Sequence, residues 1–245
     1  MHTTDLLAAW YLFLFLGFVP YAAIKSARAV RAGAAVPPRS TTYRRTLITE
    51  LIFLAVSLFA GHAAEIDLWG GDEVGLGVAA AVPILLVLAL VALHGIWNIT
   101  PEDRKRRLLL TRPQETGELG WWFLVSLAAG VVEEVVYRGV MAALVLTALT
   151  GRMGGAPPPW PPTLGGDFSL AWWATVAVCV TAFVLGHAGQ GLPRAVFLSV
   201  FAIACHVLVR ATGSLYPAIA FHFLYDFCGG IAYIRFARKA TPETA

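Results

Sequence analysis

The chain alternates between long apolar runs and short polar segments, which is the pattern of a protein that crosses a membrane several times. Each run approaches or exceeds the roughly 20 apolar residues that an α-helix needs to span a bilayer. They lie at residues 5–24, 46–64, 74–97, 119–149, 169–187, 193–211 and 214–236. The fourth run is longer than one perpendicular span requires, so we expect a tilted helix or a helical extension. The pattern predicts an all-α, polytopic membrane helix bundle of about seven transmembrane helices.

Basic residues are distributed unevenly between these runs, and their distribution predicts the orientation of the bundle. The segments after the first and third runs, and the C-terminal end, each contain several Lys or Arg residues. The segment after the second run instead contains only acidic charges, at Glu65, Asp67, Asp72 and Glu73. Because basic loops stay on the cytoplasmic side, we expect the N-terminus outside and the C-terminus in the cytoplasm.

The composition agrees with a membrane protein. Hydrophobic residues make up 58% of the chain and charged residues 13%, where a soluble domain has roughly 25% charged residues. No polar stretch is long enough to build a separate core, so we expect a single membrane domain. The net charge of +3 is explained by the loops and does not indicate a nucleic-acid partner. An Arg-rich, Lys-poor chain with much Ala and Gly favours a bacterial cell membrane, with the lipid bilayer as its partner.

Three charged residues stand inside the apolar run 119–149. They are Glu133, Glu134 and Arg138. One charge at the centre of a bilayer costs roughly 2.5–3.5 kcal/mol even on the lenient insertion scale, so a functional site is the default hypothesis. Glu134 and Arg138 are four residues apart on one helical face and can form a structural ion pair. That pair leaves Glu133 without a partner.

Two later runs carry further polar residues. His187 closes the run 169–187, whereas His222 and Asp226 lie inside the last run and share a helical face. A lone histidine at a helix end is more often an interfacial or core residue than a catalytic one. Polar groups in hydrocarbon have to find one another, however, so we expect the three helices to converge on one hydrated site.

The order of these motifs resembles the CAAX protease and bacteriocin-processing (CPBP) family of intramembrane peptidases, which includes the type II CAAX prenyl endopeptidases. The patterns EExxxR, FxxxH and HxxxN/D match Glu133-Glu134…Arg138, Phe183…His187 and His222…Asp226. The resemblance implies an endopeptidase that acts on a membrane-associated protein or peptide. It also implies a peptidase core at 119–236, preceded by transmembrane helices without a recognised motif at 1–118 and followed by a cytoplasmic tail at 237–245.

Hydrolysis of an amide needs an activated water, a stabilised oxyanion and a proton for the leaving amine. Glu133, desolvated in an apolar helix, suits the general base, and His187 can share its water or donate the proton. His222 can bind the oxyanion, and the resemblance assigns Asp226 to the same task. A carboxylate cannot donate a hydrogen bond. Asp226 therefore acts as a protonated donor, which we favour because the family accepts asparagine here, or orients His222, or helps to bind a cation.

Three alternatives stay open at this stage. Two histidines with carboxylates can form a zinc site, although there is no HExxH and the candidates come from separate helices. The resemblance favours a glutamate-type peptidase that requires no cofactor. A non-catalytic family member would serve as an immunity or scaffold protein. A proton-coupled transporter uses similar residues, but we find no internal repeat that would favour one.

Overall fold

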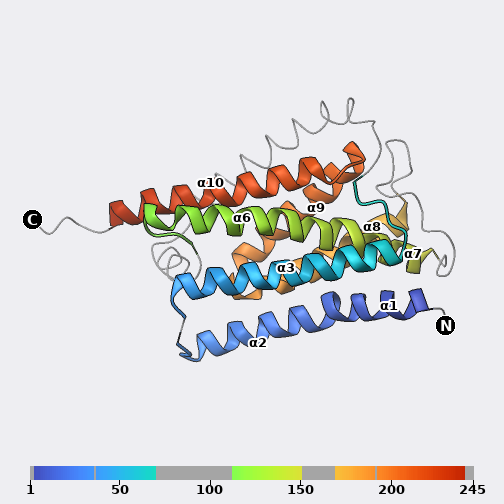
Figure 1. The fold of residues 1–245 in the computed structure, drawn as a ribbon, viewed down its shortest axis with the longest axis horizontal. Helices are drawn as coiled ribbons and strands as arrows, with labels where there is room; N and C mark the ends of the chain where they lie inside the picture. The colour runs from blue at the N-terminus through green and yellow to red at the C-terminus, as the bar shows by residue number, and fades with distance from the viewer. Residues whose placement is uncertain (1–2, 36, 70–111, 151–168, 191, 241–245) are drawn as a thin grey trace, which may run out of the picture.

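The computed structural model describes residues 3–35, 37–69, 112–150, 169–190 and 192–240. Within these ranges the regular structure is entirely helical, which confirms the predicted all-α class. The predicted run at 74–97 lies outside the described residues. Figure 1 shows the helices aligned along the long axis of a bundle, with the start of the first helix and the end of the last at opposite ends.

The first two apolar runs form two long helical rods. In the first rod, α1 (Thr3–Leu12), the π-helical segment η1 (Phe13–Phe18) and α2 (Val19–Arg31) follow one another without a break. The second rod is α3 (Arg39–Ala63), which returns alongside the first (Figure 1).

The over-long fourth run forms one continuous helix with a change of winding in its middle. A 3-10 turn, η2 (Thr116–Glu118), leads into α6 (Leu119–Glu133). The π-helical segment η3 (Glu134–Val140) then connects α6 to α7 (Met141–Leu149). Single-turn π segments inside α-helices occur frequently at functional sites. Here the segment begins at the second of the two consecutive glutamates.

The last part of the chain contains α8 (Leu170–Gly186), η4 (Ala188–Gln190), α9 (Leu192–Thr212) and α10 (Tyr216–Ala240). Ser169 caps α8, because its side-chain oxygen accepts a hydrogen bond from the backbone N–H of Trp172 at 3.2 Å. Gly213 has a φ of +66°, a left-handed conformation that commonly ends a helix, and it separates α9 from α10.

Five of the helices in the described part of the chain are long and apolar enough to cross a membrane. They are Asp5–Val30, Arg39–Ala63, Thr116–Leu149, Arg194–Thr212 and Tyr216–Ile234. α8 is apolar too, but its 17 residues make it shorter than the predicted run. These helices support a multi-pass membrane protein in a lipid bilayer. The count of seven and the orientation of the termini stay predictions.

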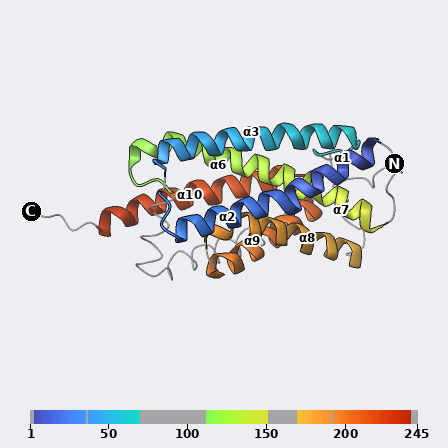
Figure 2. The ribbon, with the colours of Figure 1, turned by 90° about the horizontal axis from the view of Figure 1, so that it is seen from below.

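The central helix of the bundle is α6, which packs against both α3 and α10 (Figures 1 and 2). Seen from below, α2 lies beside α8 (Figure 2). The contact between α6 and α10 depends on Gly130, because a Cβ atom added there would lie 2.9 Å from the backbone nitrogen of Phe223. This close approach brings Glu133 of α6 opposite His222 of α10.

Candidate active site

The two consecutive glutamates stand at the junction between α6 and the π-helical segment η3. Oε1 of Glu134 lies 3.2 Å from Nη1 of Arg138, and both side chains have no exposed surface. The Cζ atom of Arg138 also lies 4.7 Å from the centre of the Phe183 ring, a cation–π contact. The structure therefore brings the expected ion pair together and buries it completely. Phe183 of the FxxxH motif forms one wall around it.

Glu134 has a second partner that the sequence did not indicate. Its Oε1 atom lies 2.8 Å from Nδ1 of His222 on α10. Since Arg138 stabilises the carboxylate, Glu134 accepts a hydrogen bond from the Nδ1–H of His222. The opposite ring nitrogen, Nε2, lies 3.7 Å from Oε2 of Glu133. The imidazole of His222 thus faces both glutamates.

His187 reaches Glu133 from another direction. It caps the C-terminus of α8, and its Nδ1 atom lies 2.8 Å from the carbonyl oxygen of Phe183. A carbonyl only accepts, so Nδ1 carries a proton and Nε2 is the nitrogen available to the site. Nε2 lies 3.8 Å from Oε1 of Glu133. The two histidines therefore approach different oxygens of the same carboxylate.

Asp226 lies one turn after His222 and pairs with an arginine from outside the predicted motifs. Its Oδ2 atom is 3.8 Å from Nε2 of His222, and its Oδ1 atom is 3.3 Å from Nη2 of Arg112. Arg112 precedes η2 and is one of the basic residues between the third and fourth apolar runs, whose distribution predicts only the orientation of the bundle. An adjacent guanidinium stabilises the charged form of a carboxylate. This contact favours an ionised Asp226 that orients His222, which was one of the alternatives left open.

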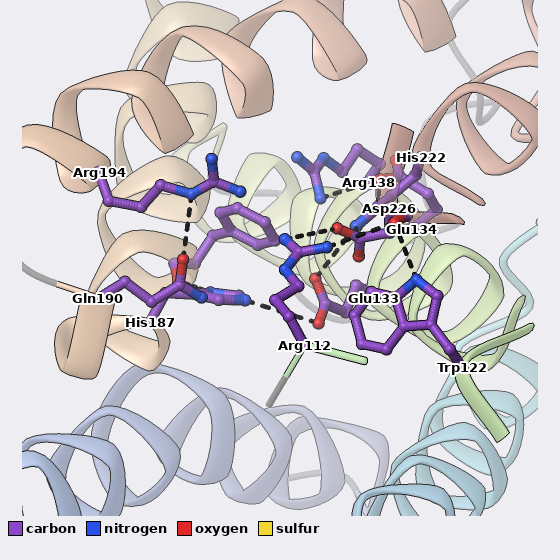
Figure 3. Close-up of polar contacts among 11 residues, drawn as sticks. Arg112, Trp122, Glu133, Glu134, Arg138, His187, Gln190, Arg194, His222 and Asp226 are labelled. Carbon is purple, nitrogen blue, oxygen red and sulfur yellow. Dashed lines mark hydrogen bonds and ion pairs between the residues drawn. The ribbon is translucent and has the colours of Figure 1, made fainter. Parts of the chain in front are cut away.

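Trp122 of α6 holds Arg112 and Asp226 in place. Its Nε1–H donates to the backbone oxygen of Asp226 at 3.1 Å, and the Cζ atom of Arg112 lies 4.9 Å from the indole centre. Figure 3 shows these side chains with Glu133 and His222, converging from α6, α10 and the segment before α6. The structure therefore shows the predicted helices converging on one polar cluster.

The central part of the chain matches a known family. Residues 115–228 match the family described as type II CAAX prenyl endopeptidase Rce1-like. We refer to these residues as the Rce1-like region. The resemblance found in the motifs is thereby confirmed, and the match supports an intramembrane protease of the CAAX type. The chain has no match among curated proteins or solved structures.

The Rce1-like region includes every site residue predicted from the motifs, but it does not include Arg112 or the first three helices. Its site has a buried part and an accessible part. The side chain of His222 is only 5% exposed, whereas those of Glu133, Asp226 and His187 are 16%, 20% and 23% exposed. Glu133 is thus a partly exposed carboxylate that both histidines face.

A second arginine borders the Rce1-like site on the side of His187. Nε of Arg194 donates to Oε1 of Gln190 at 3.1 Å, as Figure 3 shows. The guanidinium also lies over the rings of Phe197 and Tyr225. Neither Arg194 nor Arg112 stands inside a motif, so their proximity to the site depends on the fold and had no signal in the sequence.

No group of three or more His, Cys, Asp and Glu side chains that could hold a metal ion occurs among the residues that the structure describes. His187 and His222 both face Glu133, and Asp226 also faces His222; histidines and carboxylates are able to bind zinc. The metal-free reaction therefore stays a prediction, which a chelator tests.

Proposed function

We propose that the chain is an intramembrane endopeptidase that hydrolyses a peptide bond of a membrane-associated protein or peptide with a water activated by Glu133. The observation that carries this proposal is the position of Glu133, whose two oxygens face Nε2 of His187 at 3.8 Å and Nε2 of His222 at 3.7 Å. Its side chain is 16% exposed, so it is not closed off by the surrounding helices. A carboxylate so placed can receive a proton while the neighbouring histidines stabilise the charges that form.

In the first step Glu133 accepts a proton from water as the water oxygen attacks the carbonyl carbon of the scissile bond. A new C–O bond forms, and the electron pair of the C=O double bond moves to the carbonyl oxygen.

His222 is the donor that we assign to the resulting oxyanion. Its Nδ1–H is taken by Glu134, so Nε2 is the position that carries a second proton when the ring is cationic. Glu133 and Asp226 both lie within 4 Å of Nε2, and two carboxylates favour the cationic ring. In this proposal Asp226 acts as an anion, held by Arg112, that orients and charges His222.

In the second step the tetrahedral intermediate collapses and the C–N bond breaks. The proton taken up by Glu133 passes to the leaving nitrogen, either directly or through Nε2 of His187. The contact between Nδ1 of His187 and the carbonyl of Phe183 keeps Nε2 directed at Glu133 throughout. Glu134 and Arg138 take no part in proton transfer in this scheme, and their role is to fix the ring of His222.

A library of fluorescence-quenched peptides tests the proposal with purified protein in detergent and in liposomes. Peptide cleavage by the parent protein, lost in Glu133→Gln, is the expected result. A correctly folded parent that cleaves no peptide would instead support the immunity or scaffold function. Ion-dependent uptake into liposomes without cleavage would support the transporter.

A further inference from the structure

Arg194, near the start of α9, has a side chain that its neighbours hold in place. Its Nε–H donates to Oε1 of Gln190 at 3.1 Å. Its Cζ atom lies 4.8 Å from the centre of the Phe197 ring and 5.7 Å from the centre of the Tyr225 ring. These two rings stack on each other, with their centres 5.5 Å apart and an angle of 25° between their planes. The guanidinium of Arg194 is therefore held by a hydrogen bond and by aromatic contacts.

The charge of Arg194 is not balanced by an acid within the described part of the chain. The other two arginines drawn in Figure 3 each pair with a carboxylate, Arg138 with Glu134 and Arg112 with Asp226. Arg194 forms no ion pair with any residue that the structure describes. A half-buried charge without a counter-ion is unfavourable, so an external anion would stabilise it. A planar guanidinium has paired N–H donors that match the two oxygens of a carboxylate.

Arg194 lies on the side of the site that His187 occupies. The backbone N–H of Gln190 donates to the carbonyl oxygen of His187 at 2.9 Å, so the partner of Arg194 follows His187 by one 3-10 turn. Tyr225, the other neighbour of Arg194, directly precedes Asp226 on α10. Figure 3 shows Arg194 and Gln190 grouped with His187 at one side of the polar cluster. The arginine therefore borders the site next to the histidine that ends α8.

The proposed reaction decides which part of a substrate lies beside Arg194. The two histidines approach different oxygens of Glu133, and in that scheme the carbonyl oxygen of the scissile bond faces His222 while its nitrogen faces His187. The segment that follows the scissile bond therefore begins next to His187. A 3-10 helix rises about 2 Å per residue and an extended peptide advances about 3.3 Å per residue. This segment therefore reaches the surroundings of Gln190 and Arg194 within its first few residues.

We propose that Arg194 binds a carboxylate in the segment of the substrate that follows the scissile bond. The proposal rests on the proposed function of Glu133 and His187, and it adds a preference for acidic leaving segments. The carboxylate is either the free C-terminus of the substrate or the side chain of an acidic residue close to the cut. Both sources present the same chemistry to the guanidinium, and a matched set of peptides distinguishes them.

Three quenched peptides that share the residues around the cut test the proposal on the parent protein. The first ends in a free carboxylate a few residues after the cut, and the second ends in an amide at the same position. The third also ends in an amide but has a glutamate in the segment after the cut. A bond between a guanidinium and a carboxylate should raise kcat/KM of the first or the third peptide about 10- to 100-fold above that of the second. A higher value for the first alone identifies the C-terminus, and a higher value for the third identifies the acidic side chain. Equal values for all three would overturn the proposal.

Variants of the protein test whether Arg194 is the residue responsible. In Arg194→Gln the difference between acidic and amidated peptides should disappear. Arg194→Lys should keep part of the difference, because an ammonium group has the charge without the paired donors. The matched control is Arg45→Gln, because Arg45 is exposed on α3 and its replacement should keep the parent's ratio of rates. The parent's ratio in Arg194→Gln, whatever the overall rate of that variant, would overturn the proposal.

Peptide binding tests the same site without cleavage. Short peptides that correspond to the leaving segment, as the acid and as the amide, are titrated with Glu133→Gln protein, and fluorescence anisotropy gives their Kd values. The acid should bind about 10- to 100-fold more tightly than the amide, and Glu133→Gln/Arg194→Gln should lose the difference. Equal affinities, as expected if Arg194 binds a lipid phosphate instead, would overturn the proposal even where peptide cleavage supports the role of Glu133. Tighter binding of the acid without any cleavage by the parent would contradict the peptidase and support the carboxylate site, so the two failures are distinguishable.

Discussion

Nδ1 of His222 lies 2.8 Å from Oε1 of Glu134, and this contact ties α10 to the π-helical segment in the middle of the α6–η3–α7 helix. The same carboxylate pairs with Arg138, so one buried acid fixes both a histidine and an arginine. The other ring nitrogen of His222, Nε2, faces Glu133 at 3.7 Å. The position of the proposed oxyanion donor therefore depends on an ion pair that is completely buried.

Replacing Arg138 by alanine should unfold the protein more readily than it changes the chemistry. The substitution leaves Glu134 as a buried charge with His222 as its only partner among the described residues, and loss of one member of a buried pair costs about 3–5 kcal/mol. Thermal unfolding in detergent measures the effect. Arg45→Ala is the control, because Arg45 is exposed on α3. An Arg138→Ala protein with the parent's melting temperature and no activity would show that the arginine acts on the substrate.

Replacing Arg112 by alanine should reduce peptide cleavage. In our account Arg112 keeps Asp226 ionised, so its loss allows Asp226 to take up a proton and removes the anion that charges His222. The double variant Arg112→Ala/Asp226→Asn should be about as active as Asp226→Asn alone, because Arg112 acts through the charge of Asp226, and the two substitutions should therefore not be additive. If Asp226 acts instead as a protonated donor, Arg112→Ala alone should keep or increase activity, since the arginine opposes protonation. Steady-state kinetics of the three variants distinguishes the two roles.

Gly130→Ala should weaken the contact between α6 and α10. Its new Cβ atom would lie 2.9 Å from the backbone nitrogen of Phe223 and 3.2 Å from the backbone oxygen of Ile219. Overpacking of this kind costs about 1–3 kcal/mol and should displace His222 from Glu133. Gly120→Ala, also on α6, is the matched control because nothing lies within 4 Å of its added Cβ. Equal melting temperatures and activities for the two variants would show that the close approach is unimportant.

The motifs were readable from the sequence because each depends on the spacing within one helix. The i,i+4 pairs Glu134–Arg138 and His222–Asp226 require only a helix, and the long apolar runs predicted the helices themselves. We expected the motifs to meet in one site because placing charged side chains in hydrocarbon costs free energy. Arg112 was missed because it reaches the site through a tertiary contact with Asp226, from a segment without a motif.

The double role of Glu134 was also outside the reach of the sequence. Consecutive residues of an α-helix point about 100° apart, so a regular helix gives no reason to expect Glu133 and Glu134 to face one histidine. The change to π-helical winding begins at Glu134, at the position where both carboxylates approach His222. The apolar pattern of this run is compatible with either winding and therefore did not predict the change.

Chelation should leave peptide cleavage unchanged if the reaction uses Glu133 and water alone. The measurement compares the initial rate before and after dialysis of the purified protein against a strong chelator. Loss of cleavage that zinc restores would contradict the metal-free reaction. It would also assign the histidines and Asp226 to a metal site.

The comparison of the parent with Glu133→Gln tests the central claim most directly. Both proteins are purified in detergent, their melting temperatures are measured, and cleavage of one quenched peptide is followed under single-turnover conditions, with Glu115→Gln as the control. The amide of Glu133→Gln keeps the shape of the side chain but cannot accept a proton, so we expect the rate to fall by about 10²- to 10⁴-fold at an unchanged melting temperature. A Glu133→Gln protein that cleaves the peptide at the parent's rate would contradict the account.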